Sequence, residues 1–433
     1  MSGPQERLNS RQWRVIAIFA LGAMFEFFDN YVIAFVLAFI VKPWALSVGE
    51  SATVLLSSGL GGLAGSLIWG AVADRYGRKL AFVASLLVTA TASLLLAFTP
   101  EGNWVYLASV RALVGLGVGG FFVPIILVQE IVPASRKGFA SGFLSTAAAS
   151  GLVLGALSAA TMTDVLGWRG LFLLGTLPGF LAIIALKALP ESPSWLGGKG
   201  RVDEATKALR WTSGDPEIVW TAPAASGAAK AKSDTAALIA GIVTNFGTVT
   251  AYTALVMWSP TLIVQVQGIA PGEAAKLMII IAAIGMTSRL CIGAISDRVG
   301  RRRAGISVCI GAALSVMLAS FVARGVIVGQ EHFWMALGLA FVFADASFAV
   351  LAAYTAEIFP AAARGRSSGI SYAAGGVGKV VGPLGFGLAI GASNVLKPEM
   401  TITAVFAGFG FIAILFVIAA GAYAFIRPGL TRR

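Results

Sequence analysis

The sequence has little charge, one histidine and two cysteines. Only 12% of its 433 residues are charged, roughly half the share in an average soluble protein, which excludes an ordinary soluble domain. His332 is the only histidine, no metal site can be built around it, and no Ser-His-Asp set is present, so we expect neither a metal site nor an enzyme. Cys291 and Cys309 fall in consecutive apolar segments and form no disulfide framework or metal spacing.

Most of the sequence consists of long apolar segments. Hydrophobic residues make up 57% of the chain, and the mean hydropathy is +0.85. Each run is long enough to cross a bilayer as a helix. The sequence therefore predicts an all-α membrane protein with twelve transmembrane helices, near residues 13–40, 51–73, 80–98, 104–128, 138–161, 168–188, 235–264, 272–295, 304–323, 332–356, 366–391 and 402–425.

The placement of basic residues predicts the topology. Of the 32 Lys and Arg residues, five lie in loops opposite the amino-terminal side, three lie within spans, and the remaining 24 share the amino-terminal side. By the positive-inside rule, both termini and the long middle loop lie in the cytoplasm. The net charge of +12 thus reflects topology rather than nucleic-acid binding. The first span is too long for a cleavable signal, and we expect multi-pass insertion in the plasma (inner) membrane of a bacterium.

Two motifs each occur twice in the sequence, and the two copies are separated by nearly the same number of residues in both cases. Residues 70–79 and 293–303 share the pattern Gly-x-x-x-Asp-Arg-x-Gly-Arg, and their aspartates lie 223 residues apart. Residues 130–138 and 357–365 share a Glu-x-x-Pro-Ala pattern that ends in Gly, and their glutamates lie 227 residues apart. Repeats at one period indicate two pseudo-symmetric six-helix bundles. We assign them to residues 1–189 and 235–433, joined by a cytoplasmic linker at 190–234 with a short helix at 202–211.

The repeated loops combine tight turns with charge. Gly77 and Gly300 permit a bend that a side chain would block, while Asp74 and Asp297 can accept from helix-terminal amides or pair with arginines. A purely topogenic role explains the arginines but not the repeated glycine and aspartate, so we favour a conformational latch. The candidate gating residues are Gly70, Asp74, Arg75, Gly77, Arg78, Glu130, Arg136, Asp297, Arg298, Gly300, Arg301, Glu357 and Arg364.

Two carboxylates lie near the middle of the first span. Glu26 and Asp29 are three residues apart and therefore share one helical face. A charge at that depth costs about 2.5–3.5 kcal/mol. Arg111, in the fourth span, is an intramembrane cation that needs an anionic partner. These residues form either a structural ion pair or a site that binds a substrate or a proton, and we favour the binding site.

The second half carries its own polar groups within spans. Lys379 lies amid glycines, more than ten residues from either end of the eleventh span, which argues against snorkelling to the interface. Pro260 predicts a break in the seventh span. Aromatic residues in such spans can also face lipid or the core. The candidate substrate-binding set is Lys379, Tyr252, Trp258, Tyr372, Asn245 and Asp345.

The duplicated loops resemble the signature of the major facilitator superfamily, and the resemblance covers the whole chain. Residues 130–138, 357–365 and 190–196 resemble its sugar-porter and organic-ion branches, although Ser194 stands where a basic residue is common. Residues 26–29 are similar to the first-helix signature of the metabolite:proton symporters. The aromatic-acid:proton symporters usually have two aspartates there and an arginine in place of Lys379. The resemblance implies two bundles that rock about a central site, with Asp29 and Arg111 as the coupling pair.

We therefore expect a proton-coupled symporter that imports a small organic anion, a carboxylate with or without an aromatic ring. In this hypothesis Glu26, Asp29 and Arg111 couple the proton and Lys379 holds the substrate carboxylate. We expect no cofactor, and the proton is the coupling ion. The bilayer and the substrate are the partners, and the protein is a monomer. Three alternatives stay open: a sugar or polyol symporter in which Lys379 pairs with Asp345, a cation or drug efflux antiporter, and a non-transporting receptor.

Overall fold

The computed structural model describes residues 8–120, 122–133, 136–221, 235–359, 364–391 and 398–424, and these ranges are almost entirely helical. In the described part of the first half, the apolar runs predicted from sequence form a bundle of seven helices. They are α1 (Ser10–Ile40), α2 (Val48–Tyr76), α3 (Arg78–Ala97), α4 (Trp104–Val118), α5 (Phe122–Ile131), α6 (Lys137–Leu174) and α7 (Leu177–Ala188).

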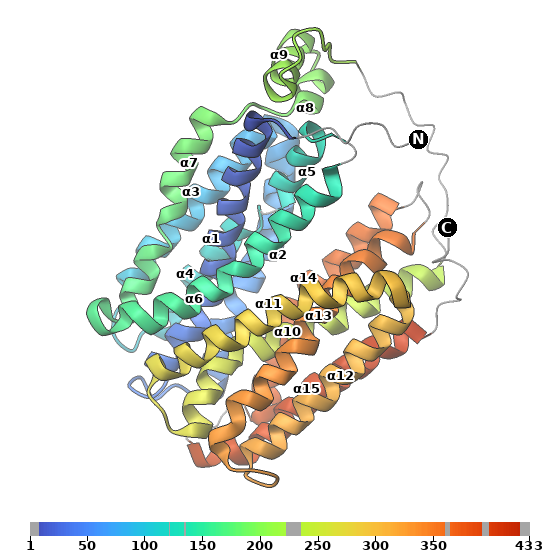
Figure 1. Ribbon diagram of the computed structural model, residues 1–433. Coiled ribbons are helices and arrows are strands. Elements are labelled where there is room, and N and C mark those ends of the chain that lie inside the picture. The colour runs from blue at the N-terminus through green and yellow to red at the C-terminus, as the bar shows by residue number, and fades with distance from the viewer. Residues whose placement is uncertain are drawn as a thin grey trace.

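The second half forms another bundle, and short helices lie between the halves. The connecting helices are α8 (Pro193–Gly198) and α9 (Val202–Ser213). The second bundle contains α10 (Thr235–Gln267), α11 (Pro271–Val299), α12 (Arg301–Ala323), a 3₁₀ turn at Gln330–His332, α13 (Phe333–Glu357), α14 (Arg364–Ile390) and α15 (Pro398–Ala424). The first bundle lies at the upper left of Figure 1 and the second at the lower right.

All twelve predicted spans fall on these helices, which confirms the fold class. Ten helical stretches in the described part of the chain are long and apolar enough to cross a membrane. The fourth span is divided into α4 and α5 after Gly119. The fifth and sixth spans form α6 and α7, and α6 changes direction at Gly167, whose φ is 64°. Only glycine adopts that backbone region without strain.

The predicted break at Pro260 is wrong. α10 runs from Thr235 to Gln267 with Pro260 inside it. Proline cannot donate to the carbonyl one turn earlier, which usually kinks a helix. Here Pro260 is buried against neighbouring helices. Tertiary packing therefore keeps the helix continuous where its local sequence favours an interruption.

The short helix predicted at residues 202–211 is confirmed as α9, which lies with α8 at one end of the first bundle (Figure 1). Asn9 connects α9 to the start of α1. Its side-chain oxygen accepts from the backbone N–H groups of Arg11 and Gln12, and its Nδ2 donates to the carbonyls of Thr212 and Ser213 at 2.8 Å. One side chain thus caps α1 and fixes α9 to the bundle.

The opposite end of the first bundle is held by a cluster of aromatic and charged side chains. Glu101 accepts hydrogen bonds from Trp44 Nε1 at 2.9 Å and from Arg169 at 2.8 Å. These two donors lower the pKa of Glu101 below its ordinary value. The guanidinium of Arg169 also lies 4.2 Å from the ring of Trp168. The loops after α1 and α3 are thereby tied to α6.

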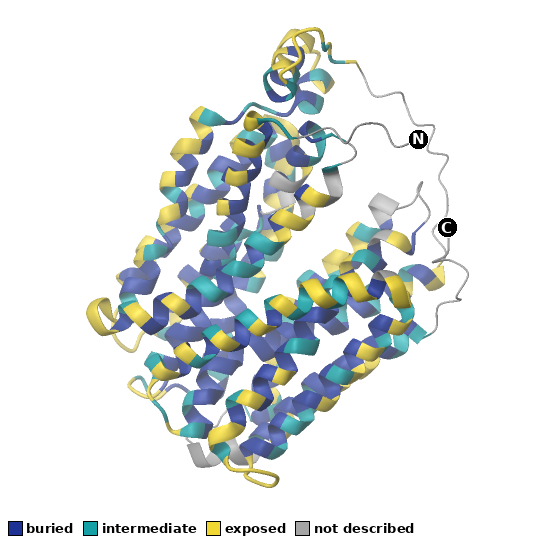
Figure 2. Ribbon diagram, viewed as in Figure 1, coloured by how far each residue is buried: buried dark blue, intermediate teal, exposed yellow. Residues whose placement is uncertain are grey.

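Burial follows the pattern of a membrane protein. Buried residues fill the interior of each bundle, and exposed residues lie on its outer faces (Figure 2). Many of the exposed residues are large and apolar. Leu67, Val165 and Leu314 are 78%, 82% and 68% exposed on those faces. Isolated apolar residues on a soluble protein are ordinary, but continuous apolar faces on spanning helices match a hydrocarbon solvent.

The two bundles meet mainly along α2 with α14, α6 with α11 and α1 with α10, and α1 also contacts α11. Along α2, the contacts with α14 run from Val48 and Ala52 beside Gly387 to Leu63 beside Gly376. These positions lie in the half of α2 that is farther from α8 and α9. In Figure 1 the bundles diverge toward the end that carries α8 and α9. The interface is therefore closed at one end of the molecule.

Close helix packing within the first bundle depends on glycine. A Cβ on Gly61 of α2 would collide with the backbone of Ala112 in α4, and a Cβ on Gly115 of α4 would collide with the backbone of Ser58 in α2. Small residues of this kind let helix backbones approach in membranes. The glycines of the fourth span therefore position Arg111, which precedes them on the same helix.

Candidate functional site in the cavity between the bundles

A cavity of about 210 Å³ lies where the two bundles meet. Side chains of α1 and α6 from the first bundle and of α10, α11 and α13 from the second line it. They are Phe27, Tyr31, Ser145, Ala148, Ala149, Leu152, Tyr252, Ala282, Met286, Arg289, Asp345 and Phe348. The cavity combines apolar walls with a few convergent polar groups, which is the usual composition of a small-molecule site.

The charged part of the cavity wall is an ion pair within the second bundle. Nη2 of Arg289 lies 2.5 Å from Oδ1 of Asp345, and the hydroxyl of Tyr252 donates to the same oxygen at 3.1 Å. The side chains of Arg289 and Asp345 are 19% and 6% exposed. Nε of Arg289 is buried without a partner among the described residues. The guanidinium therefore retains a donor that these residues do not use.

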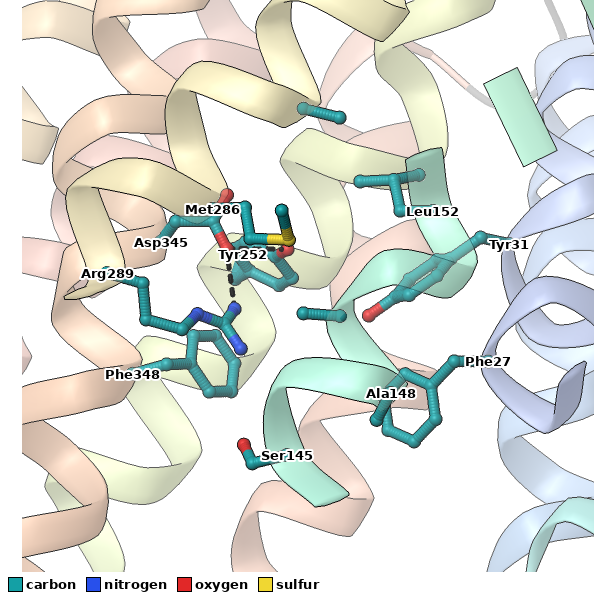
Figure 3. A pocket seen from close by; sticks show the side chains of 12 residues that line it. Phe27, Tyr31, Ser145, Ala148, Leu152, Tyr252, Met286, Arg289, Asp345 and Phe348 are labelled. Atoms are coloured by element: carbon teal, nitrogen blue, oxygen red, sulfur yellow. Dashed lines mark hydrogen bonds and ion pairs between the residues drawn. The ribbon is translucent and has the colours of Figure 1, made fainter. Parts of the chain in front are cut away.

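Aromatic rings flank this ion pair from both bundles. The guanidinium of Arg289 lies 5.2 Å from the ring of Phe348, and Phe348 packs edge-to-face on Tyr252 at 4.7 Å. Across the cavity, Phe27 and Tyr31 of α1 lie 6.0 Å apart. Figure 3 shows Arg289 on one side and the hydroxyl of Tyr31 pointing into the space from the other. The arrangement can hold an aromatic ring beside a cation.

Glu26, Asp29 and Arg111 lie close together inside the first bundle, and all three are fully buried. The carboxylate of Asp29 accepts from the Ser93 hydroxyl at 2.9 Å. Arg111 donates to the backbone carbonyls of Asp29 and Asn30 at 2.5 and 3.1 Å rather than to a carboxylate oxygen. Both carboxylate oxygens of Glu26 and Oδ2 of Asp29 have no hydrogen-bond partner in the described part of the chain.

One helix connects this buried cluster with the cavity. Phe27 and Tyr31 are four residues apart and line the cavity, whereas Glu26 and Asp29 point from other positions of α1 into the bundle interior. Positions four apart share a helical face. The buried carboxylates and two of the cavity-lining side chains therefore belong to the same helix.

The structure places several predicted substrate-binding residues outside the cavity wall. Trp258 donates from Nε1 to the Pro383 carbonyl at 3.1 Å and is fully buried. Asn245 donates to the Gly241 carbonyl and to Thr355 within the second bundle. Tyr372 is 50% exposed. Of the predicted set, Tyr252 and Asp345 line the cavity.

Lys379 lies near the cavity but is not part of its wall. Its Nζ is 5.9 Å from the ring centroid of Phe27, which does line the cavity. The side chain is exposed, and among the described residues it forms no ion pair. The pairing of Lys379 with Asp345 that the sugar alternative assumed is wrong, because Asp345 pairs with Arg289; a sugar as the substrate stays open.

Sequence reasoning counted Arg289 as a cation within a span but did not assign it to the site. Phe27, Tyr31 and Phe348 were also missed. An ionisable residue within a span indicates a functional site by default, and this signal alone would have identified Arg289. The aromatic residues carry no comparable signal, because the chain contains 27 phenylalanines and most pack in cores.

At the end that carries α8 and α9, the first repeated loop takes part in a hydrogen-bonded network. Arg78 forms an ion pair with Glu130 and donates to the Ser192 hydroxyl at 2.9 Å. Oε1 of Glu191 accepts from the backbone N–H groups of Arg78 and Lys79 at 2.8 and 3.0 Å. The helix-terminal amides are therefore capped by Glu191, a residue absent from the predicted gating set, rather than by Asp74.

Gly77 and Trp195 complete this network. Gly77 has a φ of 110°, and a Cβ at that position would collide with the Glu191 carboxylate. Nε1 of Trp195 donates to the Asp74 carbonyl at 2.9 Å. Gly70 and Arg75 lie on α2, just before the turn, and Arg136 precedes α6. Within the described residues, these contacts join the loop to α5 and α8 of the same half of the molecule.

The second repeated loop forms a smaller network. Gly300 has a φ of 93° and separates α11 from α12, which matches the turn predicted there. Arg301 pairs with Glu357 at 3.1 Å and also bonds the Ser296 hydroxyl. Arg298 is exposed at the end of α11. The side chains of Asp297 and Arg364 lie outside the described residues.

The network gives a test that separates a latch from a topogenic signal. Glu191→Gln removes one negative charge from the α3 cap but leaves every basic residue in place. We expect the maximal transport rate to fall by about fivefold (about 1 kcal/mol, the usual value of such a charge–dipole contact), with ligand affinity unchanged. The rate in proteoliposomes checks this, with Glu204→Gln on α9 as control. An unchanged rate in Glu191→Gln would favour the topogenic role.

The fold and the cavity define a class of protein: a multi-pass membrane transporter built from two helical bundles with a cavity between them. Residues 19–344 match the family model described as Major Facilitator Superfamily. The chain belongs to the Major Facilitator Superfamily.

Two relatives and one solved structure show the range of similar proteins. The chain is 30% identical to the niacin transporter NiaP of Acinetobacter baylyi, over 86% of each chain. It is 26% identical to the glucose transporter GlcP of Staphylococcus epidermidis, over 95% of this chain and 94% of the relative. Its fold matches the partially occluded inward-open xylose transporter XylE of E. coli with a TM-score of 0.75 at 17% identity, over 96% of this chain and 100% of that one.

Proposed function

We propose that this protein is a proton-coupled symporter that imports a small aromatic carboxylate of the size of niacin. The observation that carries the proposal is Arg289, a cation in the cavity wall with aromatic rings on both sides of the cavity. Arginine binds carboxylates through paired N–H groups. A niacin transporter among the relatives, 30% identical over 86% of each chain, supports this choice of substrate.

The size of the cavity favours a single-ring solute. Its volume of about 210 Å³ is below the roughly 300–1,000 Å³ of sites for drug-sized ligands. In the proposed pose the carboxylate lies at Arg289, and the ring lies between the Tyr252–Phe348 pair and the Phe27–Tyr31 pair. The Tyr31 hydroxyl can donate to a ring nitrogen or accept from a ring hydroxyl. Lys379, beside Phe27, attracts the anion toward the cavity.

Proton coupling is assigned to Glu26 and Asp29. Their carboxylates are fully buried, and three of their four oxygens have no hydrogen-bond partner within the described ranges. A proton on either carboxylate removes the cost of burying its charge, and Arg111 holds the adjacent backbone of α1. In the proposed cycle the pair takes up one proton from outside and releases it inside as the bundles rock. Both termini and the linker lie in the cytoplasm of a bacterial cell, so α8 and α9 mark the inner side.

A neutral sugar is the second candidate substrate. The glucose transporter among the relatives favours it, and so does the structure, since Asp345 already compensates the charge of Arg289. A cavity without net charge can bind hydroxyl groups through Tyr252 and Ser145. The proposal therefore requires a test in which charge and shape are varied separately.

A thermal-shift screen on purified protein provides this test. Nicotinate, benzoate and 4-hydroxybenzoate should each raise the melting temperature by several degrees, because a ligand at 100 times its Kd stabilises the folded state by about 2.7 kcal/mol. Nicotinamide has the same ring without the charge and should have no effect. Stabilisation by glucose or xylose, with none by the acids, would overturn the anion assignment. Uptake into proteoliposomes with an alkaline interior then establishes the direction of transport.

A further inference from the structure

The charged groups of the cavity wall already neutralise each other, which is unfavourable for binding an anionic substrate; the inference drawn from this rests on the proposed function. Arg289 is already neutralised by Asp345. An anion that binds beside an intact ion pair brings an uncompensated negative charge into a poorly solvated space, which is costly. Either the substrate is neutral, or the ion pair changes when the substrate binds.

The geometry of the pair favours a change. Both described donors, Nη2 of Arg289 and the Tyr252 hydroxyl, converge on the same oxygen of Asp345. The guanidinium stays against the ring of Phe348 at 5.2 Å, and its Nε has no partner among the described residues. Arg289 can therefore exchange one carboxylate for another without leaving its aromatic support.

The surroundings of Asp345 allow its carboxylate to become neutral in place. The charged and titratable groups that face it are Arg289 of α11, Tyr252 of α10 and, across the cavity, Tyr31 of α1. Among the described residues of α12 and α14, which also pack on α13, none has a charge that interacts with Asp345. Oδ2 points toward Gly285, where a Cβ would collide with it. A protonated Asp345 can still accept from Tyr252.

We propose that Asp345 is a proton-linked competitor of the substrate for Arg289 and thereby couples anion binding to proton uptake. In this exchange the contact between Asp345 and Arg289 breaks, and the substrate carboxylate forms the same contact with Arg289. One proton from the surrounding solution adds to Asp345. Charge is balanced, because one anion and one proton enter together. Asp345 is then a second proton site, in the second bundle, separate from Glu26 and Asp29.

The exchange predicts a specific pH dependence of binding. Between pH 6 and 9 nicotinate and benzoate stay ionised, so any proton taken up belongs to the protein. Where Asp345 is ionised before the substrate binds, the Kd for nicotinate should rise about tenfold per pH unit, and binding should take up about one proton per anion. Isothermal titration in two buffers of different ionisation enthalpy measures both quantities.

Asp345→Asn tests the assignment. The amide cannot titrate and does not compete for Arg289 as an anion. We expect this variant to bind nicotinate at pH 8.5 at least about tenfold more tightly than the unsubstituted protein, with no pH dependence and no proton uptake. Glu331→Gln, an exposed acid-to-amide change, serves as the matched control. Asp345→Glu keeps a titratable group, should restore proton uptake, and also shows whether loss of folding explains a defect in Asp345→Asn.

The outcomes separate this inference from the proposed function. If no aromatic acid binds the unsubstituted protein, the proposed function fails. If nicotinate binds, and Asp345→Asn retains the pH dependence and the proton uptake, the function stands and the exchange is wrong. Weaker binding of Asp345→Asn at every pH would mean that Asp345 only positions Arg289, and it would overturn the exchange as well.

Discussion

Replacing Glu26 with glutamine and Asp29 with asparagine together lowers uphill accumulation of nicotinate by about tenfold for each unit of pH difference. Each coupled proton contributes about 1.4 kcal/mol per pH unit, equivalent to a factor of ten. The two carboxylates share one proton in the proposed cycle, so their removal eliminates one such factor. Exchange of labelled for unlabelled substrate requires no net proton movement and should continue.

Proteoliposomes with an imposed pH difference measure this result. The changes preserve side-chain size, and the amide oxygen introduced by Asp29→Asn can still accept the hydrogen bond that the Ser93 hydroxyl donates at 2.9 Å. Glu331→Gln again serves as control. Accumulation that stays unchanged in the double variant would remove Glu26 and Asp29 from the coupling mechanism. If accumulation falls as expected, adding Asp345→Asn to the double variant should abolish what remains of the uphill accumulation, because the second proposed proton site is lost as well.

Replacing Arg289 with glutamine weakens binding of nicotinate by about 100-fold or more. Truncating one member of a buried charged contact costs about 2–5 kcal/mol, and about 1.4 kcal/mol corresponds to tenfold in affinity. Arg289→Lys should recover part of this loss, because lysine keeps the charge but lacks the planar pair of donors. Isothermal titration at pH 6.5 measures the affinities.

Arg289→Gln also leaves Asp345 buried without its cation, which itself destabilises the protein. The double variant Arg289→Gln/Asp345→Asn removes both charges. A loss of binding in this variant therefore cannot be caused by an unpaired Asp345. Lys379→Gln is the informative comparison, since Lys379 was the substrate anchor expected from sequence. It should raise the KM by no more than about threefold, the effect of losing an attractive charge outside the contact. A larger loss in Lys379→Gln than in Arg289→Gln would reverse the roles of the two cations.

Local sequence patterns predicted the fold well. Apolar length determines whether a segment can span the bilayer, and it depends only on neighbours in the chain. The repeated motifs then divided the spans into two halves. One failure is local as well: Pro260 lies inside a continuous helix, because its burial among neighbouring helices outweighs the lost backbone hydrogen bond.

The site was less predictable, and three cations within spans show why. Arg111, Arg289 and Lys379 carry the same charge in similar apolar surroundings along the chain. Their roles differ in space: Arg111 bonds backbone carbonyls inside the first bundle, Arg289 lines the cavity, and Lys379 stays exposed beside it. The partner of Asp345 was equally unpredictable, because the sequence alone does not show which cation of the second half lies next to it.

By itself the sequence determined the class of this protein: a duplicated chain of twelve spans with charges placed where a soluble core would not tolerate them. These properties follow from composition and order along the chain. Only the tertiary structure decided which charged side chains are neighbours. Successive residues of a helix point in directions about 100° apart, so the packing of each helix determines which of its side chains face the cavity. The packing of α11 against α6 and α13 therefore selected Arg289, rather than Lys379, as the cation of the cavity.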